Sequence, residues 1–283
     1  MTSQPAITVS CEFYPPRTEK GVDTLRRVRE ELNVLNPEYY SVTFGAGGST
    51  QAQTFDTVTE IQQQSGVDAA PHLSCIASTA DNIRQLLHDY KDKGVKRIVA
   101  LRGDKPSGWV GRLGEFAYAN ELVKFIREET GDHFTIEVAA YPEVHPQAKS
   151  AETDLKFFKQ KVDAGASAAI TQYFYNADAY AYFLDDCRKL GIEIPIVPGI
   201  MPIYNYEQLV RFSDTCGAEV PRWLKQRLQG LAEDKEGLKE FGLDVVTSLC
   251  ERLIQEGAPS LHFYTLNRSD FTLEIVKRLN TSS

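Results

Sequence analysis

The chain has 283 residues, enough to bury one large core, and a single barrel-type domain fits this length as well as two smaller domains. Its 31 basic and 39 acidic residues give a net charge of -8, so a nucleic acid backbone or an anionic membrane surface would be repelled. Residues 1–10 have no basic segment, and no uncharged apolar run approaches the length of a membrane span. We therefore expect a soluble, cytoplasmic protein that binds neither nucleic acid nor membranes.

The five cysteines are odd in number, widely scattered and never arranged as a C-x-x-C pair. This pattern argues against a disulfide framework and against a zinc site built from thiolates. We expect reduced thiols that serve mainly in packing.

An alternation of apolar residues over residues 7–13 predicts the first strand, and the pair Pro15-Pro16 prevents its continuation. Helical spacing follows over residues 21–36, where Pro37 ends the helix. The same order of apolar strand, polar exit, turn and amphipathic helix recurs along the chain. The further predicted strands cover residues 39–44, 68–75, 97–101, 134–140, 168–175, 194–200 and 261–266. The further predicted helices cover residues 79–93, 115–130, 151–164, 178–190, 206–215, 221–231, 239–256 and 269–279, with one more that Ser49 or Thr50 can cap.

Eight strands that alternate with helices and short turns predict parallel strands joined by helical crossovers. The count of eight favours closure, so the predicted fold is an α/β, (β/α)8 TIM barrel in which residues 1–283 form a single domain. An open doubly wound sheet is the alternative, because periodicity does not distinguish closure from twist. The string Gly45-Ala46-Gly47-Gly48 lacks the G-x-G-x-x-G spacing of a dinucleotide site, so it favours a tight turn over a phosphate cradle.

Polar residues at strand exits are the candidate functional residues, because the loops after the strands build the active site of a closed barrel. Glu12 is the most informative, since it ends the first strand directly before the proline pair. Crowding by Phe13 and Tyr14 predicts a raised pKa and a role as general acid near neutral pH. The alternative is a carboxylate paired with a cation such as Arg17. The strand-exit residues are Glu12, Thr43, His72, Arg102, Asp104, Glu143, His145 and Gln172, with Tyr141 and Tyr173 nearby.

Other chemistries find weaker support in these residues. The histidines and carboxylates at the exits have the side-chain types of a metal site, but no H-x-H, H-x-x-x-H or H-E-x-x-H pair occurs. A Schiff-base mechanism needs a lysine at a strand exit, where only Lys105 is available, and no G-x-S-x-G elbow is present. Asp104 lies close to Arg102 in the sequence, so it could serve equally as an anion held in a salt bridge or as an acid. We predict no metal site.

Taken in order, the strings at the strand exits resemble those of methylenetetrahydrofolate reductases. The resemblance covers about residues 7 to 280, and several blocks in the same order argue against coincidence. The strings are Glu12-Phe13-Tyr14-Pro15-Pro16-Arg17, Ser41-Val42-Thr43-Phe44-Gly45-Ala46, Ala70-Pro71-His72-Leu73, Ala100-Leu101-Arg102-Gly103-Asp104, Ala140-Tyr141-Pro142-Glu143-Val144-His145-Pro146, Ile170-Thr171-Gln172-Tyr173-Phe174, Pro198-Gly199-Ile200 and Phe263-Tyr264-Thr265-Leu266-Asn267-Arg268.

That family consists of flavin-dependent (β/α)8 barrels that reduce 5,10-methylenetetrahydrofolate to 5-methyltetrahydrofolate, a step that feeds methionine synthesis. The hydride comes from NADH or NADPH and passes through FAD, with nucleotide and folate occupying the site in turn. The resemblance implies that Glu12 is the general acid that assists opening of the methylene bridge, giving a 5-iminium cation. It also implies that Asp104 lies beside the flavin and the pterin, where its charge favours that cation.

Further residue roles are implied by the same resemblance. Gln172 would contact the pterin or the nicotinamide, and Phe212 would stack on the group that occupies the flavin face. Gln208 and Arg268 would help to hold the folate. The implied FAD contacts are Thr43, Phe44, His72, Arg102, Gly103, Asp104, Ala119, Tyr141, His145, Ala148, Asp154, Phe157 and Lys161, with Arg102 and Lys161 offering charge to the pyrophosphate.

The chain departs from the family pattern in places. Gln160 stands where bacterial relatives can carry a further basic residue next to Lys161, so the grip on the diphosphate is expected to be weaker or to come from elsewhere. The segment 105–114, with Trp109, is particular to this chain, and we assign it no role. The resemblance further implies that an S-adenosylmethionine-binding regulatory region is absent, and that the protein is a homo-oligomer, with tetramers known among bacterial forms.

Three rival functions are weighed against this one. They are a flavin-dependent barrel of the proline dehydrogenase type, a metal-dependent barrel hydrolase or lyase, and a barrel that binds folate without catalysis. The choice between NADH and NADPH stays open, because no acidic or basic residue that reads the ribose stands at a diagnostic position.

Overall fold

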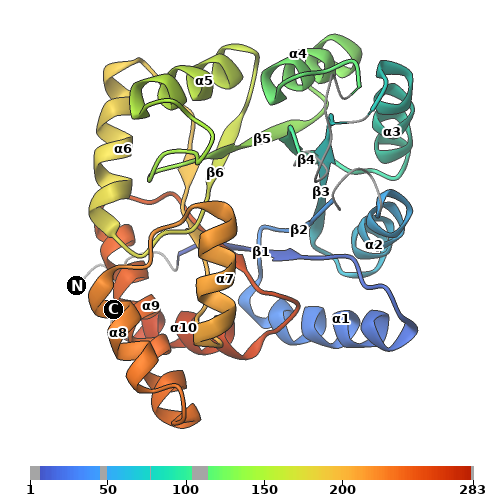
Figure 1. The fold of residues 1–283 in the computed structure, drawn as a ribbon. Coiled ribbons are helices and arrows are strands. Elements are labelled where there is room, and N and C mark those ends of the chain that lie inside the picture. Colours follow the sequence, from blue (N-terminus) through green and yellow to red (C-terminus); the bar gives the residue numbers. More distant parts are fainter. Residues whose placement is uncertain (1–6, 45–49, 77, 104–113, 282–283) are drawn as a thin grey trace, which may run out of the picture.

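The computed structural model describes residues 7–44, 50–76, 78–103 and 114–281, which form a ring of strands surrounded by helices (Figure 1). The hydrogen-bonded order of the strands is β7-β6-β5-β4-β3-β2-β1-β9-β8, and every pair is parallel. The strands are β1 (Val9–Phe13), β2 (Tyr39–Val42), β3 (Asp68–Ser74), β4 (Arg97–Leu101), β5 (Thr135–Ala140), β6 (Ala168–Thr171), β7 (Ile196–Val197), β8 (Gly199–Ile200) and β9 (Leu261–Tyr264).

The two ends of this strand order are joined by the chain itself. β7 and β8 are two halves of one extended segment, and only Pro198 separates them. β7 pairs with β6 and β8 pairs with β9. Because proline has no N–H to give to a ladder, regular pairing is interrupted there. The sheet returns on itself, which confirms the predicted TIM barrel over the open sheet.

Helices cover the outside of the strands and begin at residues that can cap them. Thr79, Ser150 and Asn205 each accept a hydrogen bond from the backbone N–H three residues further on. Such caps contribute about 1 kcal/mol each. The helices are α1 (Glu19–Leu32), α2 (Gln51–Gln64), α3 (Ala80–Asp92), α4 (Ala119–Thr130), α5 (Ala151–Asp163), α6 (Ala177–Lys189), α7 (Tyr206–Cys216), α8 (Arg222–Gly230), α9 (Lys235–Gln255) and α10 (Asp270–Thr281), with a 3-10 turn, η1 (Asn33–Leu35).

The predicted elements agree with the structure in type and order and differ at their ends. The strand predicted at 97–101 is found as β4. The strand predicted over 168–175 stops at Thr171, because Tyr173 and Tyr175 leave the ladder and bond to other parts of the rim. The Tyr173 hydroxyl is 2.9 Å from Oγ of Ser213, and the Tyr175 hydroxyl donates to the Met201 carbonyl at 3.2 Å.

Side chains of each strand alternate between two apolar layers. Val9, Cys11 and Phe13 of β1 belong to the large core between strands and helices. Ser10 and Glu12 therefore turn to the barrel interior, because successive side chains of a strand point to opposite faces. Inside the barrel a second buried cluster comes from four strands, namely Tyr39, Ala70, Val99 and Ile170.

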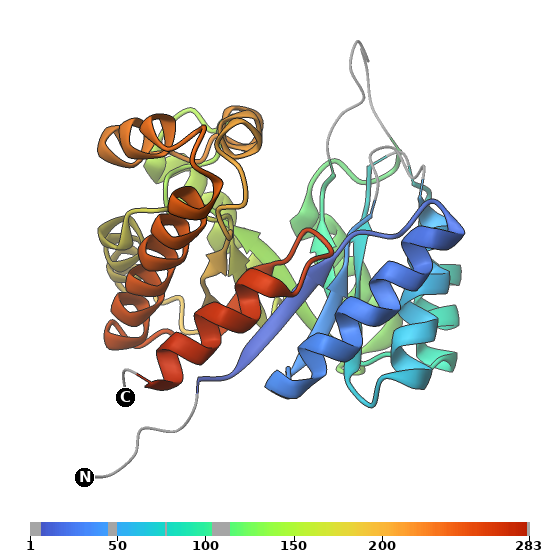
Figure 2. The ribbon, with the colours of Figure 1, turned by 90° about the horizontal axis from the view of Figure 1, so that it is seen from below.

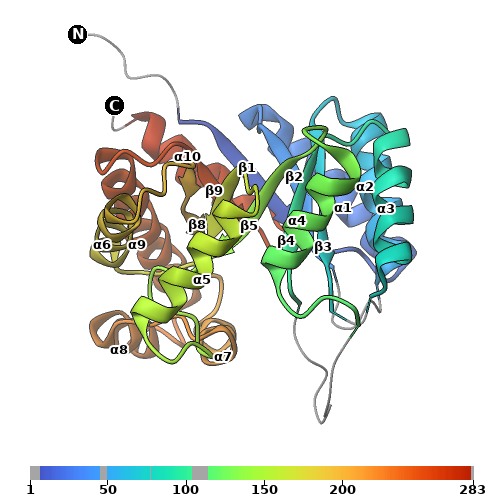
Figure 3. The same cartoon turned by 90° about the horizontal axis from the view of Figure 1, so that it is seen from above.

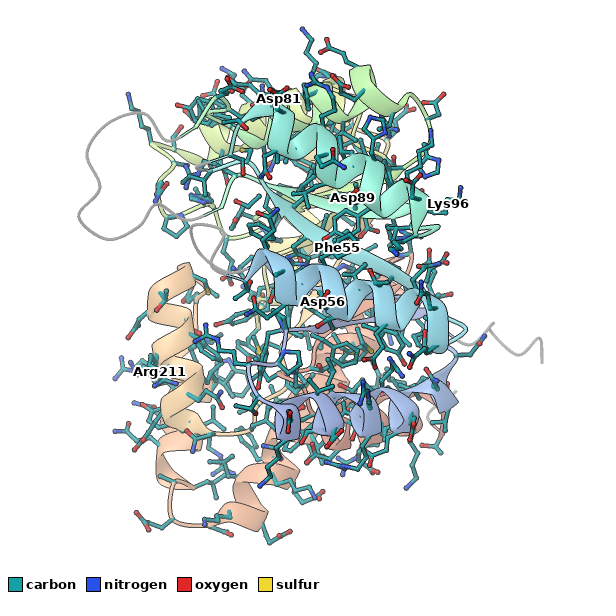
Figure 4. All side chains as sticks on the ribbon, turned by 90° about the vertical axis from the view of Figure 1, so that its right-hand side faces the viewer. Phe55, Asp56, Asp81, Asp89, Lys96 and Arg211 are labelled. Atoms are coloured by element: carbon teal, nitrogen blue, oxygen red, sulfur yellow. The ribbon has the colours of Figure 1, made fainter. Side chains whose placement is uncertain are left out.

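The helices also pack against one another around the barrel. Phe55 of α2 and Tyr90 of α3 have ring centroids 5.3 Å apart, and Figure 4 shows Phe55 at the seam between these helices. Arg211 lies on α7 in the same view. The outer ring of helices is thus a continuous apolar layer that supports the strands.

α7 and α8 lie across one end of the barrel, whereas the start of β1 and the end of α10 lie toward the other end (Figures 2 and 3). The bond between Tyr173, which follows β6, and Ser213 of α7 shows that α7 stands at the end where the strands finish. We call this end the rim. Strand exits and one face of α7 are therefore brought together there.

Two further expectations concern helices and thiols. No helix in the described segments is long and apolar enough to cross a membrane. All five cysteines are free, and Cys11, Cys75, Cys187 and Cys250 are buried. These four thiols serve in packing, as predicted.

Candidate active site

Glu12 lies near the rim end of β1 and meets two histidines from other strands. Its Oε2 atom is 3.2 Å from Nε2 of His72 on β3 and 3.8 Å from Nε2 of His262 on β9. The Glu12 side chain is 18% exposed, and both histidines are buried. The rim therefore holds a carboxylate between two imidazoles, largely shielded from water.

The pKa of Glu12 departs from the expectation based on sequence. Burial raises it, but the charge of His72 and the polar contacts with His262 and His72 outweigh burial and lower the pKa to about 2. Phe13 turns into the outer core and Tyr14 is exposed, so neither crowds the carboxylate. The predicted raised pKa is wrong because neighbours in sequence face away along a strand, whereas neighbours from other strands decide the charge.

The ion-pair partners of Glu12 differ from the pairing with Arg17 that the sequence allowed. Among the described residues, its ion-pair partners are the two histidines, and Arg17 is not one of them. Nε2 of His72 is buried and makes no hydrogen bond of good geometry in the described part of the chain. Oε2 of Glu12, 3.2 Å away, is therefore a charged neighbour of His72 rather than a well-aligned hydrogen-bond partner.

The loop after β9 fixes the exit of β1. Thr265 Oγ1 donates to the Glu12 carbonyl oxygen at 2.6 Å. The Asn267 side chain accepts from the Tyr14 N–H and donates to the Tyr14 carbonyl, each at 2.9 Å. Leu266 and Asn267 adopt φ values of 52° and 56°, a left-handed conformation that costs roughly 1 kcal/mol or more per residue. These bonds hold the strained loop and set the position of Glu12.

A chain of buried polar side chains continues from His262 into the barrel. Nδ1 of His262 is 2.7 Å from Oγ of Ser10, and the His262 ring stacks on the ring of Tyr39 with centroids 5.9 Å apart. Tyr39 donates to Oε2 of Glu137 at 2.8 Å, and Arg97 donates to Oε1 of Glu137 at 2.6 Å. The histidine beside Glu12 is thus connected to an ion pair inside the barrel.

Residues implied to contact FAD follow four neighbouring strands, β2 to β5, and continue onto α4 and α5. They therefore form one continuous arc of the rim. The Nδ1 atom of His145 accepts the Gln147 N–H at 3.0 Å, and the His145 N–H is accepted by Asp154 at 2.8 Å. The residues are Thr43 and Phe44 after β2, His72 on β3, Arg102 and Gly103 after β4, Ala119 at the start of α4, Tyr141, His145 and Ala148 after β5, and Asp154, Phe157 and Lys161 on α5.

Two cations belong to this arc. Arg102 donates to Oε1 of Gln147 at 2.9 Å, which ties the exit of β4 to the loop after β5. Lys161 is half-buried and donates to the Ala139 carbonyl. Burial lowers the pKa of Lys161 to about 8, and Asp154 acts in the opposite direction. Both cations therefore lie where an anionic group bound along the arc would be attracted.

Backbone and aromatic groups complete the arc. Gly103 has a φ of 84°, and a Cβ there would lie 2.1 Å from Oγ of Ser74, so the exit of β4 needs glycine. Phe157 and Tyr118 are exposed and nearly parallel, with ring centroids 6.4 Å apart. Gln160, the departure from the family pattern, is exposed one turn of α5 from Phe157. The arc offers flat apolar surface as well as charge.

The residues implied to hold folate come from the other side of the rim. Gln172 follows β6 and lines a small cavity of about 10 Å³, room for roughly one water. Gln208 and Phe212 lie one turn apart on α7, and Arg268 follows β9 with its guanidinium 4.2 Å from the Tyr204 ring centroid. Hydrogen bonds from Tyr173 to Ser213 and from Tyr204 to Thr265 connect these three elements.

Some predicted positions lie outside the described residues. Asp104, Lys105, Trp109 and the turn at 45–48 are among them. The role expected for Asp104 therefore stays a prediction. Within the described segments, no group of three His, Cys, Asp or Glu side chains is placed to hold a metal ion.

Sequence reasoning missed several residues that the fold brings to Glu12. Ser10 and His262 are opposite one another in the β1–β9 ladder, although 252 residues separate them in the chain. The one sign in the sequence is a polar residue within an apolar strand, as in Leu261-His262-Phe263. This sign does not reveal which partner lies opposite.

Comparison with known proteins gives consistent findings. A family model described as methylenetetrahydrofolate reductase matches residues 1–280. The 5,10-methylenetetrahydrofolate reductase of Escherichia coli (strain K12) is 42% identical over 276 residues, which are 98% of this chain and 92% of that protein. The methylenetetrahydrofolate reductase (NADH) 1 of Arabidopsis thaliana is 38% identical over 291 residues, 99% of this chain but 49% of that longer protein.

Solved structures of other proteins share the fold of this chain at low sequence identity. An uncharacterized protein from Clostridium thermocellum that binds two copies of 5-methyl-5,6,7,8-tetrahydrofolic acid has a TM-score of 0.68 and 15% identity, covering 98% of this chain and 96% of that chain. An oxaloacetate acetylhydrolase has a TM-score of 0.53 and 10% identity, covering 91% and 75%. At such identities the likeness shows the barrel alone, because one barrel fold supports many chemistries.

Proposed function

The chain belongs to the methylenetetrahydrofolate reductase family, and from this premise we propose that it passes a hydride from NADH or NADPH through FAD to 5,10-methylenetetrahydrofolate. It is thus an oxidoreductase of folate one-carbon metabolism, and the product is 5-methyltetrahydrofolate. The observation that carries the proposal is the position of Glu12 at the rim, shielded and flanked by His72 and His262.

Glu12 acts as the acid of the folate reaction. Its proton goes to the nitrogen that leaves the bridging carbon, so the bond between them breaks and the remaining nitrogen shares its lone pair to give the 5-iminium cation. In the protein alone the low pKa of about 2 keeps Glu12 ionised at neutral pH. Glu12 therefore has to take up a proton before it can act, and folate that covers the carboxylate would favour its neutral form.

The residues of the arc fit FAD in shape and charge. Arg102 and Lys161 would face the pyrophosphate, while His72, Tyr141 and His145 would bond or stack along the flavin. FAD, when bound, accepts a hydride from the nucleotide and returns it to the folate substrate. Gly103 admits a backbone approach that no other residue would allow, because a Cβ there meets Ser74. The arc thus holds the cofactor by neighbouring strands rather than by a glycine-rich dinucleotide motif.

The folate side of the site rests on Gln172, Gln208, Phe212 and Arg268. Their elements are connected by hydrogen bonds across the rim, which supports a single surface made from β6, α7 and the loop after β9. The Clostridium thermocellum protein with the same fold binds a methylated folate, which agrees with a folate site in this barrel. Asp104 is expected to add negative charge beside the pterin.

Several wider statements belong to the same proposal. The nicotinamide donor is NADH or NADPH, and the naming of the Arabidopsis thaliana relative supports NADH. The protein is cytoplasmic, forms a homo-oligomer such as a tetramer, and supplies methyl groups for methionine synthesis.

Anaerobic half-reactions test this function. The purified protein should be yellow, bleach when NADH or NADPH is added, and regain colour when methylenetetrahydrofolate follows. A flavin barrel of the proline dehydrogenase type would not regain colour with this folate, and a metal-dependent hydrolase would contain metal and no flavin. A colourless protein that binds folate would reduce the proposal to a binding function.

The grip on FAD is expected to tighten when Gln160 is replaced by Arg. This change restores positive charge next to Lys161, and an exposed ion pair contributes about 0.2–1 kcal/mol, or roughly a 1.4-fold to fivefold gain in affinity. Quenching of flavin fluorescence during titration of the apoprotein measures the affinity. Gln226→Arg on exposed α8 is the matched control, because it adds the same charge away from the arc. Equal affinities for the two variants would contradict the placement of the pyrophosphate.

The folate half-reaction is expected to slow as the pH rises. Only protonated Glu12 can deliver the proton, and because its pKa is lowered to about 2, the protonated fraction falls as the pH rises. Stopped-flow measurement between about pH 6 and about pH 9 checks this, with flavin reduction by nucleotide as a reference that should vary much less. A folate half-reaction that accelerates with rising pH would contradict the assignment.

A second pH effect concerns the fold. The pKa of Glu12 is lowered from 4.5 to about 2 in the folded protein, so its ionised form favours folding. This contribution is present above about pH 4.5 and is lost as the pH falls toward 2. The Glu12→Gln variant should therefore lose less stability than the native protein when the buffer is acidified.

A further inference from the structure

We propose that Asn267 is a positioning residue of the folate half-reaction. Its side-chain amide holds the backbone that carries the acid Glu12 and joins it to the loop that carries Arg268. This inference rests on the proposed role of Glu12. Asn267 itself is assigned no contact with substrate or cofactor, so its effect is exerted through Glu12.

The ladder between β1 and β9 ends at Glu12, which lies opposite Tyr264. On its other side, β1 stays paired with β2 one residue further, to Phe13 opposite Val42. The Thr43 N–H adds a bond to the Phe13 carbonyl oxygen at 2.9 Å on that side. Beyond Glu12, the backbone of β1 is therefore supported by a strand on one side only.

Asn267 supplies the missing support through its side chain. Its Oδ1 accepts the Tyr14 N–H and its Nδ2 donates to the Tyr14 carbonyl oxygen, each at 2.9 Å. The reverse orientation of the amide would place donor against donor and acceptor against acceptor, so the two bonds together fix the orientation. Because a primary amide offers the same donor and acceptor as a peptide group, Asn267 continues the ladder past the end of β9.

Two prolines leave the exit of β1 with few other backbone bonds. Pro15 and Pro16 follow Tyr14, and a proline has no N–H to donate. The Tyr14 N–H is therefore the last backbone donor before Arg17. The Tyr14 side chain is exposed, so packing of its ring does little to hold the backbone. The bonds to Asn267 are thus the main restraint on this side of the exit.

The backbone around Asn267 is strained and is held by Thr265. Leu266 and Asn267 have φ values of 52° and 56°. Successive left-handed residues other than glycine persist where surrounding contacts impose them, and such strain gathers at functional sites. Thr265 Oγ1 accepts the Asn267 N–H at 3.2 Å and donates to the Glu12 carbonyl oxygen at 2.6 Å. Asparagine suits this position because it tolerates the left-handed conformation and also presents an amide to Tyr14.

The same loop reaches the folate side of the rim. The Arg268 N–H donates to the Thr265 carbonyl at 3.0 Å, and the Tyr204 hydroxyl donates to the same carbonyl at 3.3 Å. The Arg268 guanidinium lies 4.2 Å from the centroid of the Tyr204 ring. Both Thr265 and Asn267 are buried, so bulk water does not compete for their bonds. Residues 265–268 therefore connect the acid to a residue expected to hold folate.

A general acid acts only within hydrogen-bonding reach of the atom that it protonates, and a misplacement of about 1 Å can cost roughly a hundredfold in rate. Release of Tyr14 would allow the exit of β1 to move while Arg268 and Tyr204 keep their own contacts. The expected effect therefore falls on the rate of the folate step more than on folate binding.

Asn267→Gly is the test variant, because glycine adopts a positive φ without steric cost and the change removes both bonds to Tyr14. The limiting rate of the folate half-reaction should fall about tenfold or more. The folate concentration that gives half of this rate should change by less than about threefold, and flavin reduction by nucleotide should continue as in the native protein. Anaerobic stopped-flow measurement of both half-reactions gives these values.

Asn36→Gly is the matched control. Asn36 has a φ of 48° and is exposed between η1 and β2, at the end of the barrel opposite the rim. Within the described part of the chain its side chain makes no hydrogen bond, and the bond from its backbone N–H to the Asn33 carbonyl survives the change. Both half-reactions should stay within about twofold of the native rates.

A double-mutant cycle separates positioning of Glu12 from a general structural role. In a Glu12→Gln background, Asn267→Gly should slow the remaining folate reduction by less than about twofold, because the acid that it positions is absent. A residue that only supports the fold would slow both backgrounds by the same factor.

Thr265 gives a second, independent pair of variants. Thr265→Val keeps the shape of the side chain but removes the hydroxyl that bonds to the Glu12 carbonyl, so it should slow the folate half-reaction in the same way. Thr265→Ser keeps the hydroxyl and should recover most of the rate. If Asn267→Gly does not fold, this pair and its cycle with Glu12→Gln decide the question.

Hydrogen exchange of the Tyr14 amide tests the contact without any reaction. Asn267→Gly should exchange this amide about tenfold or more faster than the native protein, whereas Asn36→Gly should not change it. Mass spectrometry of a peptide that covers residues 12–17 can report the exchange with little background, because Pro15 and Pro16 have no amide hydrogen.

The inference is overturned if the Tyr14 amide exchanges equally fast in the native protein and in Asn267→Gly. It is also overturned if Asn267→Gly leaves folate reduction unchanged, or slows it by the same factor with and without Glu12. If Tyr14 loses protection as expected but the native protein reduces no folate, the proposed function fails, whereas the contact of Asn267 with the exit of β1 is confirmed.

Discussion

Replacement of Glu12 by Gln is expected to abolish folate reduction while flavin reduction by the nicotinamide nucleotide continues. The amide keeps the size of the side chain and can still bond to His72 and His262, but it cannot release a proton at neutral pH. General acid catalysis contributes 10²–10⁴-fold, so the folate half-reaction should fall by about a thousandfold. Anaerobic stopped-flow measurement of the two half-reactions provides the test.

Glu143→Gln is the matched control for this experiment. Glu143 is another carboxylate at a strand exit, and its Oε2 accepts the Glu219 N–H at 2.7 Å, a bond that the amide oxygen can retain. Burial raises the pKa of Glu143, so replacing the carboxylate by a neutral amide is a mild change at this position. We expect less than about a tenfold effect on the folate half-reaction.

The pair of variants also separates the rival functions. A metal-dependent hydrolase or lyase that used both carboxylates would lose activity in both variants. A fall of both half-reactions in Glu12→Gln would contradict the assignment of Glu12 as the acid, because nucleotide oxidation needs no proton from it.

The second large effect is expected from Gly199→Ala, which should destabilise the barrel by about 3 kcal/mol. A Cβ at Gly199 would lie 2.2 Å from the Thr171 carbonyl oxygen and 2.5 Å from the Tyr264 ring. Neither group can move freely, because Tyr264 donates to that same carbonyl at 2.7 Å and the Gly199 N–H bonds to Oγ1 of Thr171 at 2.9 Å. The substitution therefore separates strands where β6, β8 and β9 close the ring.

Urea denaturation followed by circular dichroism measures this loss, with Gly230→Ala as the control. Gly230 ends α8, has no atom within 4 Å of an added Cβ, and should be neutral or slightly stabilised by alanine. Folate reduction should also weaken in Gly199→Ala, because Tyr264 lies opposite Glu12 in the β1–β9 ladder. Equal unfolding midpoints for the two variants would show that the ring closes in another way.

The helices and strands and their order could be predicted because each depends on residues that are close together in the sequence. β4 was predicted with its observed ends, since the apolar run of residues 97–101 stops at Arg102 and Gly103. Pro198 shows the limit of this approach. The pattern over 194–200 predicts one strand, but whether its halves pair with two different neighbours depends on closure of the ring.

The residues of the candidate site could be predicted from the sequence only in part. Glu12 could be identified from its position at a strand exit and from the resemblance, and the structure places it beside His72, another predicted exit residue. Its pKa could not be predicted, because Phe13 and Tyr14 are near in sequence but turn away, whereas His262 is remote in sequence and adjacent in space.

By itself, the sequence determined the alternation of strands and helices, the parallel sheet and the residues that end each strand. These follow from side-chain periodicity and from proline and glycine, which act within a few residues. Only the tertiary structure decided the charge of Glu12, the contact of Ser10 with His262, and the pairing of β9 with β1. Each of these depends on side chains that closure of the barrel brings within hydrogen-bonding distance, and local periodicity contains no information about such partners.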